Sequence, residues 1–170
     1  MHILMCNDDG ILADGLRQLA TYLSQYYRVT VVAPATEQSA KSHALTTEIP
    51  LKLDAYNGED ENPRLYALTG TPSDCMKFGL SYLLADDMPD LVISGINHGF
   101  NLGSDVLYSG TVSAAMESAF YGIPGLALSV ERYSIERGHE MHPFIHELIE
   151  KIYVNGNFEG LLLSLIHISE

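Results

Sequence analysis

Short apolar runs alternate with segments of helical periodicity along most of this chain, and that alternation limits the folds open to it. Four apolar runs have the length of buried strands, at residues 3–6, 29–33, 91–93 and 126–130. Four segments repeat apolar residues at helical spacing, at residues 16–23, 72–84, 111–121 and 143–153. Two further strands are indicated around an acidic turn at 57–62, namely residues 49–55 and 65–68. This alternation is typical of an α/β fold, in which helices cover both faces of a mostly parallel sheet.

The composition favours one globular domain. The chain has 170 residues, of which 46% are apolar and 18% are charged. No apolar run approaches the ~20 residues of a membrane-spanning helix, and the first residues lack the features of a secretory signal. We therefore expect a cytoplasmic protein with no membrane partner. The formal net charge of −13 opposes binding to nucleic-acid duplexes, although a bound cation or a helix N-terminus still attracts small phosphate ligands.

Polar clusters follow three of the predicted strands, after Cys6, Ala33 and Ile93. Parallel sheets bind ligands beyond the carboxyl ends of their strands, so we expect these clusters to open onto one edge. The first cluster contains Asp8 and Asp9 ahead of Gly10, which permits a turn. Two close carboxylates repel unless a proton or a cation lies between them, and Mg²⁺ and Mn²⁺ prefer oxygen ligands. The other interpretation is a turn and helix cap, in which one carboxylate accepts backbone N–H groups.

Three other segments offer ligand contacts. Ser39, in the loop after the second strand, suits either a metal or phosphate contact or an ordinary turn. Residues 94–103 hold three glycines and two asparagine amides, in a spacing that matches neither the dinucleotide fingerprint nor the P-loop. Ser109, Gly110 and Thr111 precede a helix of small residues. Hydroxyl and N–H groups at such a helix start form either a phosphate cradle or a plain N-cap.

Several motifs occur in a fixed order between residue 1 and about residue 130: Asn7-Asp8-Asp9-Gly10, Ala33-Pro34 with Ser39 and Thr46, Gly70-Thr71-Pro72-Ser73-Asp74-Cys75, Pro89-Asp90 through Ser94-Gly95-Ile96-Asn97, Asn101 with Gly103 and Asp105, and Tyr108-Ser109-Gly110-Thr111-Val112. In this order and spacing, the chain resembles the SurE survival-protein family of metal-dependent nucleotidases.

The resemblance implies a Rossmann-like, doubly wound, mostly parallel sheet. It implies release of phosphate from nucleoside 5′- and 3′-monophosphates, which makes the expected activity that of a 5′-nucleotidase. It also implies one divalent metal ion (Mg, Mn or similar), held by Asp8, Asp9, Ser39 and Asn97. The substrate phosphate would be held by Ser109, Gly110 and Thr111, with Asn101 orienting the phosphate or the attacking water.

The end of the chain departs from the family pattern. In the family that it resembles, members continue into a C-terminal subdomain that forms homodimer and tetramer contacts, and we expect this subdomain to be truncated here. We therefore expect an incomplete phosphatase domain at residues 1–160 and a non-native or truncated tail at residues 161–170.

The expected mechanism is hydrolysis by metal-activated water, with Asp8, Asp9 and Asn97 as catalytic residues and His98 or His43 as candidate general acids. One alternative is a catalytically inactive fragment that binds metal or nucleotide. Another is an aspartyl-phosphate phosphatase with Asp8 as nucleophile, although the usual Asp-x-Asp spacing of that class is absent. A dinucleotide-dependent oxidoreductase is disfavoured because the glycine fingerprint is missing after the first strand.

Overall fold

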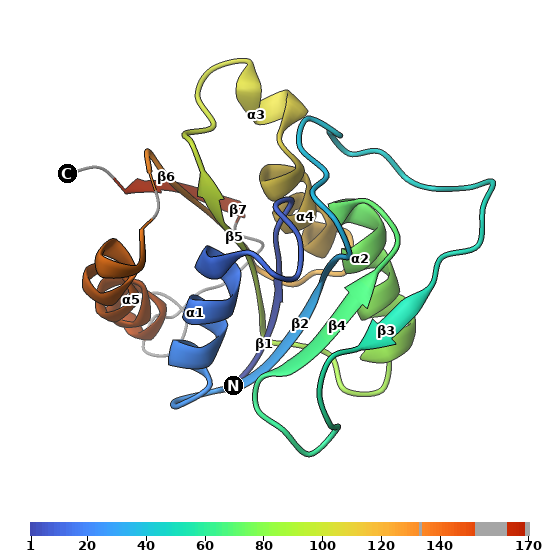
Figure 1. Ribbon diagram of the computed structural model, residues 1–170, viewed down its shortest axis with the longest axis horizontal. Coiled ribbons are helices and arrows are strands. Elements are labelled where there is room, and N and C mark those ends of the chain that lie inside the picture. The colour runs from blue at the N-terminus through green and yellow to red at the C-terminus, as the bar shows by residue number, and fades with distance from the viewer. Residues whose placement is uncertain (133, 152–162, 169–170) are drawn as a thin grey trace.

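A seven-stranded sheet forms the centre of the molecule, with helices packed on both of its faces (Figure 1). The computed structural model describes residues 1–132, 134–151 and 163–168. In chain order the strands are β1 (His2–Cys6), β2 (Arg28–Pro34), β3 (Leu53–Ala55), β4 (Arg64–Leu68), β5 (Leu91–His98), β6 (Gly125–Val130) and β7 (Leu163–Ile168). The helices are α1 (Asp14–Leu23), α2 (Pro72–Phe78) with its π-helical continuation η1 (Gly79–Leu83), α3 (Asp105–Tyr108), α4 (Gly110–Ala119) and α5 (Ile135–Ile149).

The sheet is doubly wound, as the resemblance implied. Its strands are ordered β3-β4-β2-β1-β5-β6-β7, and every pairing except that of β3 with β4 is parallel. From β1 the chain moves outward through β2 to the edge strand β3, and β4 then lies between β3 and β2. The chain next crosses to the other side of β1, where β5, β6 and β7 follow one another outward. The strand order therefore reverses between β1 and β5. Ligands of Rossmann-like sheets bind at such a reversal, beyond the carboxyl ends of the strands.

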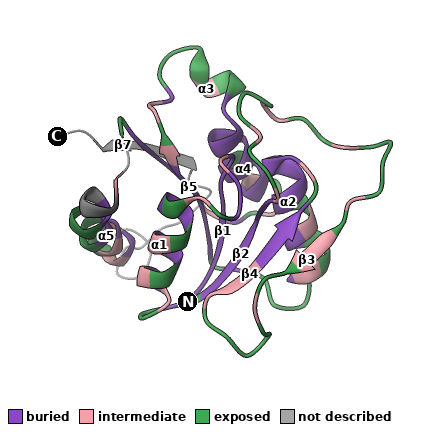
Figure 2. Cartoon of the chain, viewed as in Figure 1, coloured by how far each residue is buried: buried purple, intermediate pink, exposed green. Residues whose placement is uncertain are grey.

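Both faces of the central strands are buried, which explains why these strands read as unbroken apolar runs. Ile3 of β1 packs on one face in a cluster with Leu16 of α1 and Ile145 of α5. The next residue, Leu4, points to the other face and packs in a cluster with Met76 of α2. Figure 2 shows the central strands and most of α4 as buried, whereas α3 is largely exposed. The layered core fixes the carboxyl ends of β1, β2 and β5 beside one another.

Two predicted elements between residues 49 and 110 differ from the structure. The strand predicted at 49–55 forms only at Leu53–Ala55, because Pro50 has no N–H group for a strand ladder. The strand predicted at 91–93 is longer, because β5 continues to His98, and the short helix α3 follows at Asp105–Tyr108. The pairing of β5 with β6 shifts between Ser94 and Asn97, so the strand continues past Gly95.

The predicted helix at 143–153 begins earlier, at Ile135. Pro143 lies inside α5, although a proline there removes one backbone hydrogen bond. Burial of Met141, Ile145 and Ile149 on the inner side of the helix offsets that loss. The predicted end at residue 153 lies outside the described residues.

The last described segment, β7, pairs in parallel with β6. The interpretation of residues 161–170 as a tail outside a domain of residues 1–160 stays a prediction. Within the described ranges, no helix has the length and hydropathy needed to cross a lipid bilayer.

Candidate active site

A cleft with a volume of about 570 Å³ opens at the strand-order reversal, beyond the carboxyl ends of β1, β2 and β5. Its lining includes all four predicted metal ligands and two of the predicted phosphate-binding residues, namely Asp8, Asp9, Ser39, Asn97, Asn101 and Ser109. The expectation that polar clusters after separate strands meet at one edge is therefore confirmed. The metal-binding and phosphate-binding roles of these residues stay predictions.

The loop after β1 brings two carboxylates to this cleft. Asn7 is fully buried, and its amide donates to the carbonyl of Gly10 and accepts from the Gly10 N–H, both at 3.1 Å. Gly10 has a φ of 101°, a left-handed conformation that a residue with a side chain rarely adopts. The tight turn ends the alternation of the strand, so Asp8 and Asp9 both line the cleft.

Asp8 lies against the first turn of α4. Its carboxylate is 5% exposed, and Oδ1 accepts a 2.6 Å hydrogen bond from the hydroxyl of Thr111. A methyl group on Gly110 would lie 2.8 Å from the Cβ of Asp8 and 3.0 Å from the Cγ of Pro72, so only glycine permits this approach. Burial raises the pKa of Asp8, and the Thr111 hydrogen bond opposes that rise.

Asp9 lies in an acidic environment that the sequence only partly indicated. Burial, and then repulsion from Asp8 and Glu37, raises its pKa to about 6. Glu37 lines the same cleft and accepts a 2.7 Å hydrogen bond from the hydroxyl of Ser39. It was not predicted as a site residue, although it lies in the same polar cluster as Ser39. Asp105 of α3 adds another carboxylate to the lining. A phosphate would be repelled from this cleft unless a cation neutralised part of its charge.

The chemistry of the donor set fits a hard divalent cation. Asp8 lies in the cleft and accepts the Thr111 hydroxyl at Oδ1, and the two oxygens of a carboxylate together accept several partners. The amide nitrogen of Asn97 donates to the carbonyl of Gly99 at 2.7 Å, which leaves the amide oxygen as the end suited to a cation. In the described part of the chain, no group of three or more His, Cys, Asp or Glu side chains is arranged to hold a metal ion. A cation would therefore depend on neutral oxygens from Ser39 and Asn97 in addition to the two aspartates.

The N-terminus of α4 lies beside these carboxylates. Ser109 caps the helix by accepting the Val112 N–H at 3.1 Å. The N–H groups of Gly110 and Thr111 belong to the first helical turn, where no preceding carbonyl of the helix is available to them. The side chain of Thr111 is fully buried and its hydroxyl donates to Asp8. Asn101 is buried as well, and its amide donates to the Ser129 hydroxyl at 2.7 Å.

The structure separates the two histidines considered as general acids. His98 lines the cleft, at the end of β5. His43 contributes to another pocket, where its Nε2 lies 2.6 Å from Oε2 of Glu117. Of the two, His98 alone lies where a leaving group in the cleft could be reached.

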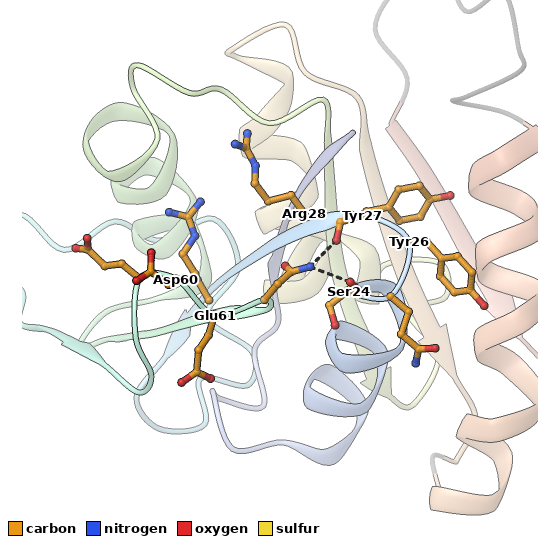
Figure 3. A pocket seen from close by; sticks show the side chains of 10 residues that line it. Ser24, Tyr26, Tyr27, Arg28, Asp60 and Glu61 are labelled. Atoms are coloured by element: carbon orange, nitrogen blue, oxygen red, sulfur yellow. Dashed lines mark hydrogen bonds between the residues drawn. The ribbon is translucent and has the colours of Figure 1, made fainter.

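A pocket at the other end of the strands, near the starts of β2 and β4, contains none of the predicted site residues (Figure 3). It lies between the end of α1 and the acidic turn at 57–62, and it is lined by side chains of both charges. Asn62 anchors this turn by donating to the carbonyls of Ser24 and Tyr27, both at 2.8 Å. Asp60 and Glu61 in the turn are exposed, which agrees with a solvated connection.

Comparison with known proteins shows the family to which this chain belongs. The sequence profile of the family described as "Survival protein SurE" matches residues 3–165. The chain belongs to the SurE family. It is 48% identical over 165 residues to the 5′-nucleotidase SurE of Thermoanaerobacter pseudethanolicus, covering 97% of this chain and 65% of that protein. It is 45% identical over 166 residues to the 5′-nucleotidase SurE of Chlorobium chlorochromatii, covering 96% of this chain and 60% of that protein.

A solved SurE structure shares this architecture. The crystal structure of the SurE protein from Aquifex aeolicus matches with a TM-score of 0.83 and 38% sequence identity, covering 98% of this chain and 66% of that one. The chain therefore spans less than two thirds of the length of these curated SurE relatives, 65% and 60% in the two cases above.

Proposed function

We propose that this SurE chain carries the active site of a divalent-metal-dependent phosphomonoesterase that releases phosphate from nucleoside 5′- and 3′-monophosphates. The observation that carries the proposal is the contact between Asp8 and the first turn of α4, made by the Thr111 hydroxyl at 2.6 Å. This contact joins an acidic, oxygen-rich cation site to a helix N-terminus that attracts phosphate. The 5′-nucleotidase names of the relatives support the same substrate class.

The cation would be held by the carboxylates of Asp8 and Asp9, the hydroxyl of Ser39 and the amide oxygen of Asn97. Magnesium and manganese suit this set because all four donors are oxygens. When bound, such a cation would stabilise charge on a phosphoryl oxygen and make an attacking water more acidic. It would also offset the burial and the neighbouring negative charge that raise the pKa values of Asp8 and Asp9.

The residues of α4 would bind the phosphate. The Ser109 hydroxyl and the N–H groups of Gly110 and Thr111 lie at a helix start, where the partial positive charge of the helix favours an anion. Thr111 donates its hydroxyl and a backbone N–H to Asp8, so it would position that carboxylate beside the phosphate as well as line the phosphate site. Asn101, fixed by Ser129, would orient the phosphate or the water from the side of β6. His98 is the candidate proton donor to the leaving oxygen.

Phosphate release from 5′-AMP and 3′-AMP tests the proposal. The chain is assayed in EDTA and then with Mn²⁺ or Mg²⁺ in excess of the chelator. Activity that is lost in EDTA and restored by metal for both substrates supports it. Trapping of a phosphorylated protein would favour the aspartyl-phosphate alternative with Asp8 as nucleophile. Nucleotide binding without phosphate release, under every metal, would favour the inactive binding fragment. Homo-oligomer formation and the cytoplasmic location stay predictions alongside this proposal.

A further inference from the structure

The segment Ser39–Thr46, termed the clasp loop, holds an unusual backbone next to the cleft. It begins at Ser39, a proposed metal ligand, and ends at Thr46, which contacts Asp74 of α2. Ala40 and Ser42 have φ values of 57° and 53°, in the left-handed region that residues with side chains seldom adopt. Two such residues within four positions persist only where surrounding contacts hold them. The position of Ser39 therefore depends on the contacts that hold this loop to the rest of the fold, and each set of contacts is termed a fastening.

The first fastening joins the clasp loop to α3. The hydroxyl of Ser42 donates to the carbonyl of Leu107 at 2.7 Å, and its N–H donates to the carbonyl of Tyr108 at 3.0 Å. Both acceptors belong to the segment that leads into Ser109. The loop is thus linked to the chain that carries the phosphate-binding helix start.

The second fastening joins the loop to the start of α2. The carboxylate of Asp74 accepts the N–H of Thr46 at 2.9 Å and its hydroxyl at 2.6 Å. Asp74 also accepts the Thr71 N–H in the capping box of α2, and the Thr71 hydroxyl donates to the carbonyl of Ala44 at 2.6 Å. A substitution of Asp74 or Thr71 would also weaken the N-cap of α2, so it could not test the role of the clasp loop by itself.

The third fastening is a hydrogen-bonded pair between His43 and Glu117 of α4. The two side chains meet at 2.6 Å, and Glu117 is only 4% exposed. A buried carboxylate requires a partner, so this contact is a strong constraint on His43. The imidazole also lies 6.0 Å from the ring of Phe120, measured between ring centroids. Because Glu117 and the proposed phosphate-binding residues belong to the same helix, this pair links the two halves of the site.

We propose that the His43–Glu117 pair positions Ser39 for metal binding by holding the clasp loop in its left-handed conformation. The inference rests on the proposed function, since it assigns a positioning residue to the metal site described there. His43 does not touch the metal or the substrate. It raises the fraction of molecules in which Ser39 lines the cleft with Asp8 and Asp9, and apparent metal affinity scales with that fraction.

The test is calorimetric titration of the metal-free chain with Mn²⁺, together with the 5′-AMP assay at saturating Mn²⁺. His43→Ala removes the pair, and we expect Mn²⁺ affinity to fall about tenfold while kcat stays within about threefold. His43→Gln keeps an N–H group that reaches Glu117, and we expect it to restore affinity to within about threefold of the wild type. Glu117→Gln changes the other member of the pair, and we expect it to lower Mn²⁺ affinity by less than His43→Ala does. His139→Ala, an exposed histidine of α5, is the matched control.

The outcomes separate the two proposals. Weaker Mn²⁺ binding in His43→Ala, with rescue in His43→Gln and no change in His139→Ala, supports the positioning role. Unchanged Mn²⁺ affinity in both His43→Ala and Glu117→Gln overturns it and leaves the proposed metal site standing. A wild-type chain that binds no Mn²⁺ overturns the metal site itself, and the positioning role with it. Circular dichroism of each variant checks that the fold is retained.

Discussion

The hydroxyl of Thr111 donates a 2.6 Å hydrogen bond to the carboxylate of Asp8, although the two residues lie 103 positions apart in the sequence. The bond joins the loop after β1 to the first turn of α4. It keeps the carboxylate of Asp8 oriented within a buried setting. Metal binding and phosphate binding, if both occur here, are mechanically linked through this contact.

Replacing Thr111 with valine tests that link while keeping the side-chain shape. We expect kcat/KM for 5′-AMP to fall about 10- to 100-fold, because Asp8 loses the donor that fixes it. The unfolding free energy should fall by about 1–2 kcal/mol. Initial rates and urea unfolding measure the two effects. Thr21→Val, at an exposed position of α1, is the control and should change neither quantity. A Thr111→Val chain with wild-type kinetics would contradict the assigned role.

Gly110→Ala tests the close approach of α4 to Asp8. The added methyl group would lie 2.8 Å from Cβ of Asp8, so the helix start must move. We expect a loss of about 1–3 kcal/mol in unfolding free energy and a large loss of phosphate release. Gly58→Ala is the matched control, since the nearest atom to its new methyl group is 3.9 Å away. Equal stability of the two variants in urea would show that the approach is looser than described.

The acidity of the cleft predicts how metal affinity depends on pH. The pKa of Asp9 is raised to about 6, so a proton competes with the cation below that pH. Mn²⁺ affinity should fall about tenfold for each pH unit below about 6, which titration calorimetry between pH 5 and 8 would measure. Asp9→Asn should bind Mn²⁺ more weakly and with a shallower pH dependence. The raised pKa of Asp8 would keep part of the slope. A flat profile in the wild type would refute this account of the cleft.

The burial of His142 between α1 and α5 predicts that acid lowers the stability of the protein. It is 4% exposed, its Nε2 has no hydrogen-bond partner among the residues that the structure describes, and its ring lies against that of Tyr22. Burial, with a smaller effect of His139, lowers its pKa from 6.5 to about 4. The unfolded chain therefore binds a proton more readily, and stability is lost as pH falls from about 6.5 to about 4.

Substitution of His142 isolates this effect. His142→Phe should flatten the dependence of unfolding free energy on pH between 4 and 6.5, by at most about 3 kcal/mol. Urea unfolding at several pH values measures it, and Phe144→Leu, at an exposed and non-titrating position of the same helix, serves as the control. If both variants lose stability with acid as steeply as the wild type, His142 is not the cause.

The strand ends of the sheet explain why much of the site could be predicted from sequence. Asp8, Ser39 and Asn97 each follow or end a parallel strand, and parallel strands end at a common edge. The apolar runs also identified most of the strands, because both faces of the sheet are covered. The family resemblance supplied the roles that spacing alone left open.

Contacts between distant segments account for what the sequence did not predict. The bond from Thr111 to Asp8 and the pair of His43 with Glu117 join loops and helices far apart in the chain, and no local pattern signals them. Glu37 is an ordinary loop acid until the fold places it beside Asp9. The helix was predicted to begin at Pro143, whereas α5 begins at Ile135, because tertiary packing outweighs the local helix-breaking preference of proline.

Phosphate release from 5′-AMP by wild type and Asp8→Asn, with EDTA and then with restored Mn²⁺, tests the central claim most directly. The account predicts wild-type activity that disappears in EDTA and returns with Mn²⁺, and Asp8→Asn activity that stays at least about a thousandfold below the Mn²⁺-restored wild type whether or not Mn²⁺ is present. Asp54→Asn, at an edge-strand position outside the cleft, should behave as the wild type. Full Mn²⁺-dependent activity in Asp8→Asn would contradict the proposed metal site.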